Sequence, residues 1–350
     1  MAVSFVPIEQ CQATQPFAEC RGVDLSGDLT DEEIVQVKRG LLKHGLLLFR
    51  NQKRLTPKRE VIFNKAFGWH DPGQSQYLFG FGAPNSEDRY SGGAQIPEWP
   101  QVSLLGNVRL RDYYGLHDIR LRPVLGLTFS GWHSDGLHDM LDGLPELTTM
   151  FNPMGWKTIS GGETFFTSGV NAIDRLDEGF VDELSRCMVA YLRSPNDDDP
   201  DECRRVQAGT PFMVEEGTRR IGFCSDAQDP DSDLNGFQFT LQHAEGGGRH
   251  PCIYSHPVTG QRSLYVSPAK AIYLLDIHTG LLRHDIQRTT ELLSMALLPS
   301  VGKSVRYAHK WCEGDFVAWL NTLVLHSASD SHNVVGDRLL HRVRLSTPKK

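Results

Sequence analysis

Trp132-His133-Ser134-Asp135 places a histidine and an aspartate two positions apart in the chain. Successive side chains of a strand point to opposite faces, so residues i and i+2 share a face. An H-x-D at the end of a strand therefore directs an imidazole and a carboxylate toward one spot. With a distant histidine, these groups form the facial triad of a non-haem Fe(II) oxygenase. The motif alone is weak, because roughly one H-x-D is expected by chance among 14 histidines. A surface turn is the alternative interpretation.

A second stretch supplies a candidate for the distant histidine. Glu313-Gly314-Asp315 is a turn signal, and Trp319-Leu320-Asn321-Thr322-Leu323-Val324-Leu325-His326 follows it. His326 thus ends an otherwise apolar strand pair. Taken by itself, a histidine in this position is more often structural than a ligand, so its role depends on the other motifs.

A third stretch is rich in arginine: Arg338-Leu339-Leu340-His341-Arg342-Val343-Arg344. Arg338 follows His326 by 12 residues, which is enough to turn and return on a neighbouring strand. Alternation places Arg338, Arg342 and Arg344 on one face, where guanidinium groups beside an apolar core need anionic partners. A bidentate guanidinium suits a dicarboxylate cosubstrate. A solvated C-terminal strand is the alternative.

The rest of the pattern predicts an α-plus-β arrangement in the first 70 residues and short strands from about Leu104 onward. Thr30-Asp31-Glu32-Glu33 is a capping box that opens a helix ending at Gly45. Leu46–Phe49 is a predicted buried strand, and Thr56-Pro57 opens a second helix to about Phe67. Later, short strands separated by Gly, Pro and Asn predict a β-sandwich or barrel. These predicted strands are 121–130, 147–154, 163–167, 252–256, 263–266, 304–309, 315–319, 323–326 and 339–346, with helices at 171–186 and 285–296.

Composition excludes several classes of protein. The chain has 350 residues, of which 39% are hydrophobic and 23% charged, as in ordinary globular proteins. Its apolar runs are far shorter than the roughly 20 residues of a membrane helix. The first residues lack the basic segment and apolar core of a signal peptide. Seven cysteines without a C-x-x-C favour reduced thiols. We therefore expect a cytoplasmic protein with no membrane partner.

The segment 194–250 differs from its surroundings, because it carries two aspartate-rich runs and then Gly246-Gly247-Gly248. We predict an insertion beside the β core that serves as a lid over the site. Its aspartates lack the spacing and the closing glutamate of an EF-hand loop. A solvated acidic loop is therefore favoured over a calcium site.

Five short motifs stand in a fixed order along the chain. They are Gly40-Leu41-Leu42-Lys43-His44-Gly45-Leu46-Leu47-Leu48-Phe49-Arg50, Gly161-Gly162-Glu163-Thr164, His256-Pro257-Val258-Thr259-Gly260 followed by Ser263-Leu264-Tyr265-Val266, W-x-N-x-x-x-x-H, and R-x-x-x-R. Together they resemble the taurine dioxygenase-like Fe(II)/2-oxoglutarate oxygenases over the chain outside 71–120 and 194–250. The resemblance implies one domain over 1–350. It also implies a mainly β fold with flanking helices, a double-stranded β-helix or jelly roll.

The resemblance also implies a set of site residues. His133, Asp135 and His326 would bind Fe(II). Thr164 and Arg338 would hold the distal carboxylate of 2-oxoglutarate, whose keto-acid end chelates the iron. Such an enzyme uses O₂ to convert 2-oxoglutarate to succinate and CO₂ and oxidises an unactivated C–H bond of a substrate.

Four further residues bear on the substrate. Arg342 stands where the family often binds the anionic group of the substrate, and His70 where it often places a substrate-contacting histidine. Phe129 replaces an asparagine of the taurine enzyme, and Lys270 replaces a pocket phenylalanine. If Lys270 faces the pocket beside Arg342, the substrate carries two or more carboxylates, because buried charges need partners. A surface lysine is the alternative.

We therefore expect a small anionic substrate that carries a carboxylate and derives from an amino acid. Hydroxylation is the default reaction. Oxidative ring closure of an N-prenylated glutamate, as in kainoid synthases, is the alternative.

Three other classes of protein are alternatives to this oxygenase. A nucleic-acid or histone demethylase shares the triad, but a net charge of −7 argues against a nucleic-acid partner. A non-catalytic β-barrel binding protein would show a broken ligand set, and a zinc hydrolase would need no 2-oxoglutarate. A homo-oligomer is compatible with the sequence, which identifies no interface.

Overall fold

The computed structural model describes residues 2–11, 14–67, 88–90, 94–122, 132–135, 145–191, 247–268, 271–329 and 334–346. Three predicted substrate-binding residues, His70, Phe129 and Lys270, lie outside these ranges. Most of the predicted lid at 194–250 also lies outside them.

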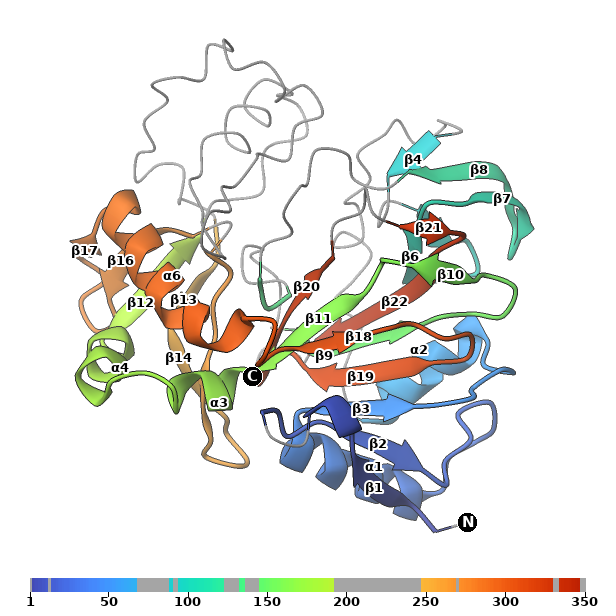
Figure 1. The fold of residues 1–350 in the computed structure, drawn as a ribbon, viewed down its shortest axis with the longest axis horizontal. Helices are drawn as coiled ribbons and strands as arrows, with labels where there is room; N and C mark the ends of the chain where they lie inside the picture. The colour runs from blue at the N-terminus through green and yellow to red at the C-terminus, as the bar shows by residue number, and fades with distance from the viewer. Residues whose placement is uncertain are drawn as a thin grey trace.

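The largest sheet brings together strands from both ends of the chain (Figure 1). Its order is β1 (Ser4–Pro7), β2 (Ala18–Arg21), β3 (Leu46–Phe49), β19 (Phe316–Leu320), β9 (Pro145–Phe151), β22 (Leu339–Ser346), β6 (Trp99–Gly106) and β5 (Ala94–Ile96). The predicted strand at Leu46–Phe49 lies inside this sheet, between β2 and β19, and all four of its residues are buried. A strand with neighbours on both sides and both faces covered is expected to be apolar throughout.

A smaller sheet faces the large one. It contains β18 (Tyr307–His309), β11 (Thr164–Ser168) and β20 (Val324–Ala328). Phe166 of β11 packs edge-on against Trp319 of β19, with ring centroids 5.2 Å apart. Two facing sheets with apolar side chains between them form the predicted jelly roll. The mainly β fold with flanking helices is thereby confirmed.

Two helices cover the outer face of the large sheet. They are α1 (Asp31–His44), which packs on β3 and β19, and α2 (Pro57–Ala66), which packs on β22 and β6. The predicted capping box is present, since the Thr30 side chain accepts from the Glu33 backbone N–H and the Glu33 carboxylate accepts from that of Thr30. Because these helices occupy one face, the inner face of β22 and β9 is left to build a site.

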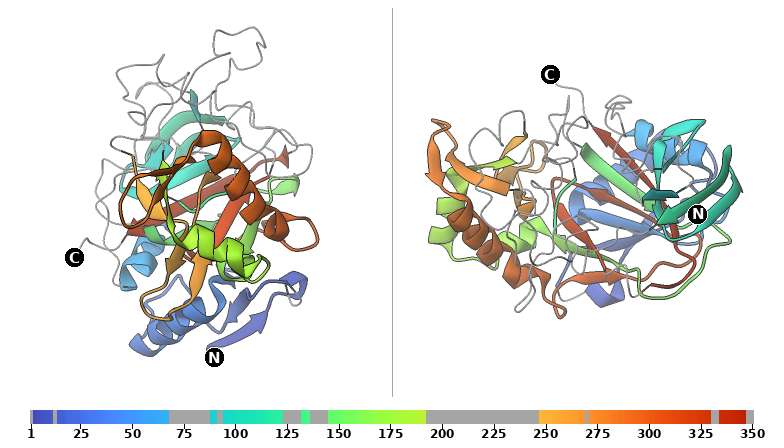
Figure 2. Two further views of the ribbon diagram at one scale, coloured as in Figure 1. Left: turned by 90° about the vertical axis from the view of Figure 1, so that its left-hand side faces the viewer. Right: turned by 90° about the horizontal axis from the view of Figure 1, so that it is seen from above.

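A second group of elements lies beside the jelly roll, as Figure 2 shows from the side and from above. Its sheet has the order β13 (Arg249–Pro251), β12 (Cys187–Tyr191), β16 (Ala271–Asp276) and β17 (Leu282–His284). The hairpin β14 (Ile253–Ser255) and β15 (Arg262–Leu264) and the helices α3 (Gly169–Ile173), α4 (Glu178–Ser185) and α6 (Ile286–Val301) complete it. The predicted helical segment at 171–186 consists of two short helices, because Asp177 caps a separate second helix there. Strands β12 and β16 were not predicted.

Shorter elements complete the described part of the chain. They are η1 (Glu9–Cys11), β4 (Asp88–Tyr90), β7 (Arg109–Tyr113), β8 (Leu116–Arg122), β10 (Thr158–Ser160) and β21 (Val335–Gly336). The five cysteines among the described residues are free thiols, as predicted for them. Among the described helices, none combines the length and the apolar character that a membrane crossing requires.

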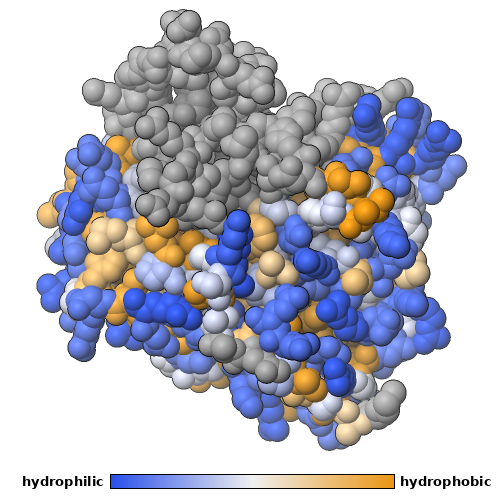
Figure 3. All heavy atoms as spheres, in the orientation of Figure 1, coloured by the Kyte–Doolittle hydropathy of each residue, from blue (hydrophilic) through white to orange (hydrophobic). Residues whose placement is uncertain are grey.

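The surface mixes polar and apolar side chains on the face shown in Figure 3. Exposed apolar side chains on the elements beside the jelly roll include Leu281, Leu282, Met295 and Leu298, of α6, β17 and the turn before β17. Homo-oligomerisation stays a prediction.

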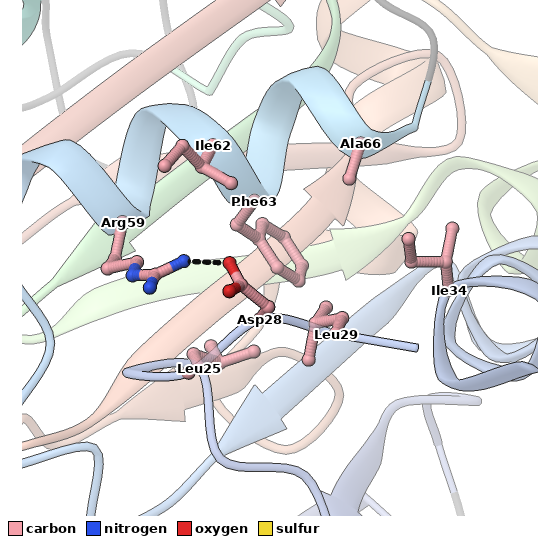
Figure 4. A pocket seen from close by; sticks show the side chains of 9 residues that line it. Leu25, Asp28, Leu29, Ile34, Arg59, Ile62, Phe63 and Ala66 are labelled. Carbon is pink, nitrogen blue, oxygen red and sulfur yellow. Dashed lines mark hydrogen bonds and ion pairs between the residues drawn. The ribbon is translucent and has the colours of Figure 1, made fainter. Parts of the chain in front are cut away.

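A pocket of about 160 Å³ lies between α1, α2 and the loop before α1 (Figure 4). Its lining is mostly apolar, and the ion pair Asp28–Arg59 crosses it. Phe63 lies in this lining and packs edge-on against Phe316, with centroids 5.1 Å apart. The pocket belongs to the helix-covered side of the large sheet and brings together no set of metal-binding groups.

Candidate active site

The structure brings the three predicted metal ligands together. His133 and His326 form an antiparallel bridge in which each backbone N–H donates to the other's carbonyl at 2.9 Å. Their rings therefore lie side by side, with centroids 4.2 Å apart. Asp135, two residues beyond His133, turns to the same spot, as the H-x-D alternation predicted. One ligand atom from each of the three lies within 4.8 Å of the others.

Asn321 holds the H-x-D segment in place. The backbone N–H of Asp135 donates to Asn321 Oδ1, and Asn321 Nδ2 donates to the Asp135 carbonyl, both at 2.8 Å. The Asp135 carboxylate itself accepts a hydrogen bond from Thr148 Oγ1 of β9 at 3.1 Å. Asn321 and Thr148 are fully buried. The position of Asp135 is therefore fixed by buried partners before any metal is considered.

The surroundings keep the ligands in the forms that bind metals. Burial alone would raise the pKa of the Asp135 carboxyl, but the nearby His326 and then the guanidinium groups of Arg344 and Arg342 hold it well below its usual range. Burial and the neighbouring His133 lower the pKa of His326 to about 3. A neutral imidazole and an ionised carboxylate both offer lone pairs to a cation.

The donor set fits Fe(II). His133 Nε2 lies 3.7 Å and His326 Nε2 lies 3.8 Å from oxygen atoms of Asp135. Such separations allow one ion to bond all three side chains. Two histidines and one carboxylate leave other coordination positions open, which is the arrangement of non-haem Fe(II) oxygenases. Thiolates, which would favour zinc or an iron–sulfur cluster, are absent from this described cluster.

Arg338 and Thr164 both lie next to the short segment 161–163. Thr164 follows this segment in the chain, and Arg338 contacts it from the position just before β22. Arg338 Nε donates to the carbonyl of Gly162 at 3.0 Å, and burial lowers the pKa of its guanidinium to about 10. Gly162 has φ +71, and a Cβ on it would lie 2.8 Å from Arg338 Cδ. Only glycine fits there without strain. The glycine of the G-G-[DE]-T motif thus makes room for the arginine.

Trp311 orients the Thr164 hydroxyl. Thr164 is buried, and its Oγ1 accepts a hydrogen bond from Trp311 Nε1 at 3.0 Å. An indole N–H can only donate, so the hydroxyl hydrogen of Thr164 is left to point elsewhere and to donate in turn. This partner of Thr164 was not predicted from the sequence.

Two arginines of β22 reach the Asp135 carboxylate from the inner face of the sheet. Arg342 Nη1 lies 4.0 Å and Arg344 Nη1 lies 3.6 Å from Asp135 Oδ1. The alternation that put them on one face was predicted, but Arg344 was not among the predicted site residues. Asn321, Thr148 and Trp311 were also missed as site residues, although Asn321 stands in the W-x-N-x-x-x-x-H motif.

A jelly roll that gathers two imidazoles, one carboxylate and nearby arginines on its inner face defines the class of mononuclear iron oxygenases. Comparison with known proteins places the chain within that class. A model of the taurine catabolism dioxygenase TauD, TfdA family matches residues 7–344, so the chain belongs to this family. It is an Fe(II)- and 2-oxoglutarate-dependent dioxygenase that uses O₂.

Individual relatives are distant. The alpha-ketoglutarate-dependent xanthine dioxygenase xan1 of Schizosaccharomyces pombe is 24% identical and aligns over 99% of this chain and 88% of its own. Pentalenolactone F synthase of Streptomyces avermitilis is 22% identical, over 92% of this chain and 88% of its own. A crystal structure of a taurine dioxygenase from Burkholderia xenovorans has a TM-score of 0.62 at 19% identity, covering 99% of this chain and 90% of its own. The names of these relatives refer to different compounds, so none of them identifies the substrate of this chain.

Proposed function

We propose that this dioxygenase oxidises an unactivated C–H bond of a small anionic substrate at the His133, Asp135 and His326 centre. The observation that carries the proposal is the approach of Arg342 to that centre, 4.0 Å from Asp135 Oδ1. A guanidinium there can hold a substrate carboxylate while the rest of the substrate lies over the metal. When bound, Fe(II) and 2-oxoglutarate supply the oxidising power, with succinate and CO₂ as by-products.

The chain's own residues would bind and orient the reactants. Arg338 donates its Nε–H to the Gly162 carbonyl. Its two Nη groups would then be available to bind the distal carboxylate of 2-oxoglutarate. Thr164 would donate its hydroxyl hydrogen to the same carboxylate, because Trp311 already occupies one lone pair of its oxygen. Burial of these groups strengthens both contacts.

The test is succinate release by the Fe(II)-loaded protein in air, with 2-oxoglutarate and a panel of small anions whose product masses are recorded. The panel includes free amino acids, N-alkylated glutamates, sulfonates and phenoxyacetates. Stimulation by a carboxylate with a gain of 16 mass units supports hydroxylation, and a loss of 2 supports the ring-closure alternative. Arg342→Met should raise KM for the active anion about tenfold or more, since one charge-assisted hydrogen-bonded pair is lost. An unchanged KM contradicts the role of Arg342.

Xanthine oxidation is a second candidate. It is favoured by the alignment with the Schizosaccharomyces pombe xanthine dioxygenase over 99% of this chain. Identity of 24% leaves the substrate contacts free to differ. Xanthine therefore belongs in the same assay, and stimulation by xanthine but by no carboxylate would replace the first candidate.

The remaining expectations stay predictions of this proposal. They are a cytoplasmic location, the absence of nucleic-acid and membrane partners, one domain over 1–350 and a lid at 194–250. The substrate roles of His70, Phe129 and Lys270 also stay predictions, because these residues lie outside the described ranges.

A further inference from the structure

Two guanidinium groups, rather than one, reach the metal-binding carboxylate. Arg342 and Arg344 lie two positions apart on β22, so their side chains leave the same face of the strand. Both are mostly buried, with 17% and 15% of their side chains exposed. Both Nη1 atoms approach the same oxygen, Asp135 Oδ1. The tips of the two side chains thus converge on the carboxylate of the candidate metal site.

In the described part of the chain, this pair of cations has one carboxylate partner in common. Among the described residues, Asp135 is the carboxylate paired with both groups. Glu146, on the same face of β9 as Thr148, has contacts of its own. Nε of Arg342 is buried and lacks a hydrogen-bond partner among the described residues. A buried donor without a partner is costly and suits a ligand that would supply an acceptor.

Binding of a metal places a further demand on this shared carboxylate. The Asp135 carboxylate must then serve a divalent cation, whose charge is added beside the guanidinium groups. When 2-oxoglutarate is bound, its charges would be met by the metal and by Arg338. Among the residues that the structure describes, two buried guanidinium groups then remain, and buried charges need partners of opposite sign. The substrate is the component still to bind.

We propose that Arg344 is a second substrate-binding arginine beside Arg342, and that the substrate carries two acidic groups, one for each guanidinium. This rests on the proposed function and narrows its substrate class from an anion to a dianion. Because the two tips converge on one oxygen, the acidic groups should stand a few bonds apart rather than at the ends of a long chain. Each guanidinium presents paired N–H groups, the geometry that matches a carboxylate.

Calorimetric titration of the Mn(II)-loaded protein tests this without turnover. N-Oxalylglycine, an analogue of 2-oxoglutarate, fills the cosubstrate position. The probes are three pairs that differ by one charge: N-acetylaspartate and N-acetylasparagine, N-acetylglutamate and N-acetylglutamine, phthalate and phthalamate. We expect the dianion to bind at least tenfold more tightly than its monoamide in at least one pair. Arg344→Met should abolish that preference, whereas Arg342→Met should weaken both members.

Two further variants keep the test decisive. Arg344→Lys retains the charge without the paired N–H groups and should keep part of the preference, even if Arg344→Met folds poorly. Arg109→Met removes an exposed arginine paired with Asp118 and should change neither affinity. Equal affinity within all three pairs, including no binding by any probe, overturns the proposal. A preference that survives in Arg344→Met overturns it as well. Succinate release is measured separately, so a failure of the proposed function is distinguishable from a failure of this inference.

Discussion

Replacing Asn321 with alanine tests whether the H-x-D segment is held in place before the metal binds. Alanine removes both hydrogen bonds between the Asn321 side chain and the Asp135 backbone, each 2.8 Å long. It leaves one buried N–H and one buried carbonyl of Asp135 without their partners. Asp135 should then sample positions that no longer match those of the two histidines.

The magnitude follows from these two contacts. Each buried group left without a partner costs roughly 1–3 kcal/mol, so the free energy of unfolding should fall by about 2–6 kcal/mol for the two groups together. Loss of a residue that positions a ligand typically weakens metal binding by about 10- to 100-fold. Urea denaturation of the metal-free protein measures the first quantity, and anaerobic titration with Fe(II) measures the second.

Asn64→Ala is the matched control. Asn64 is also fully buried and also donates two side-chain hydrogen bonds, to the Glu60 carbonyl and to Thr149 Oγ1, but it lies on α2 at the outer face of the sheet. It should lose stability of the same order and keep its affinity for Fe(II). If Asn321→Ala binds Fe(II) as tightly as Asn64→Ala, the positioning role of Asn321 is refuted.

Three more predictions concern the cosubstrate and the metal. Gly162→Ala should raise KM for 2-oxoglutarate severalfold, because the φ of Gly162 is +71 and the added Cβ would lie 2.8 Å from the Arg338 side chain. Gly155 is the control, since its φ is +90 and the space around it is open. Gly155→Ala should cost about 1 kcal/mol of stability and leave the KM for 2-oxoglutarate unchanged. Trp311→Phe should raise the same KM by freeing the Thr164 hydroxyl to rotate, and steady-state kinetics with an unchanged KM would count against this. Removal of the metal with a chelator should lower the midpoint temperature of thermal unfolding, since a ligand at 100 times its Kd stabilises the folded state by about 2.7 kcal/mol. Equal midpoint temperatures with and without the metal would contradict metal binding to the folded chain.

Local signals in the sequence predicted the parts of the fold that depend on local interactions. The capping box at Thr30 and Glu33 fixes the start of α1 through contacts three residues apart. The H-x-D motif and His326 could likewise be recognised as candidate metal ligands from the sequence, because imidazole and carboxylate side chains are typical metal ligands. The strands β12 and β16 escaped prediction because a short apolar run does not distinguish a buried strand from a piece of helix.

The missing parts of the site are those that depend on distant partners. Asn321 and Asp135 are separated by 186 positions in the chain, so the sequence names the amide but not what it holds. The alternation of side chains along β22 predicted that Arg344 shares a face with Arg342. It did not predict that both arginines contact Asp135. That contact depends on the pairing of β22 with β9 and on the position of the H-x-D segment next to these two strands.

The most direct test of the central claim is the number of Fe(II) ions bound per chain, measured anaerobically for the wild type and two histidine variants. His326→Ala removes a candidate ligand, whereas His309→Ala removes another fully buried histidine, 3.4 Å from the carboxylate of Asp315, outside the cluster. We expect one tightly bound Fe(II) per chain for the wild type and for His309→Ala, and none for His326→Ala. Tight binding of one Fe(II) by folded His326→Ala would contradict the assignment of the metal centre.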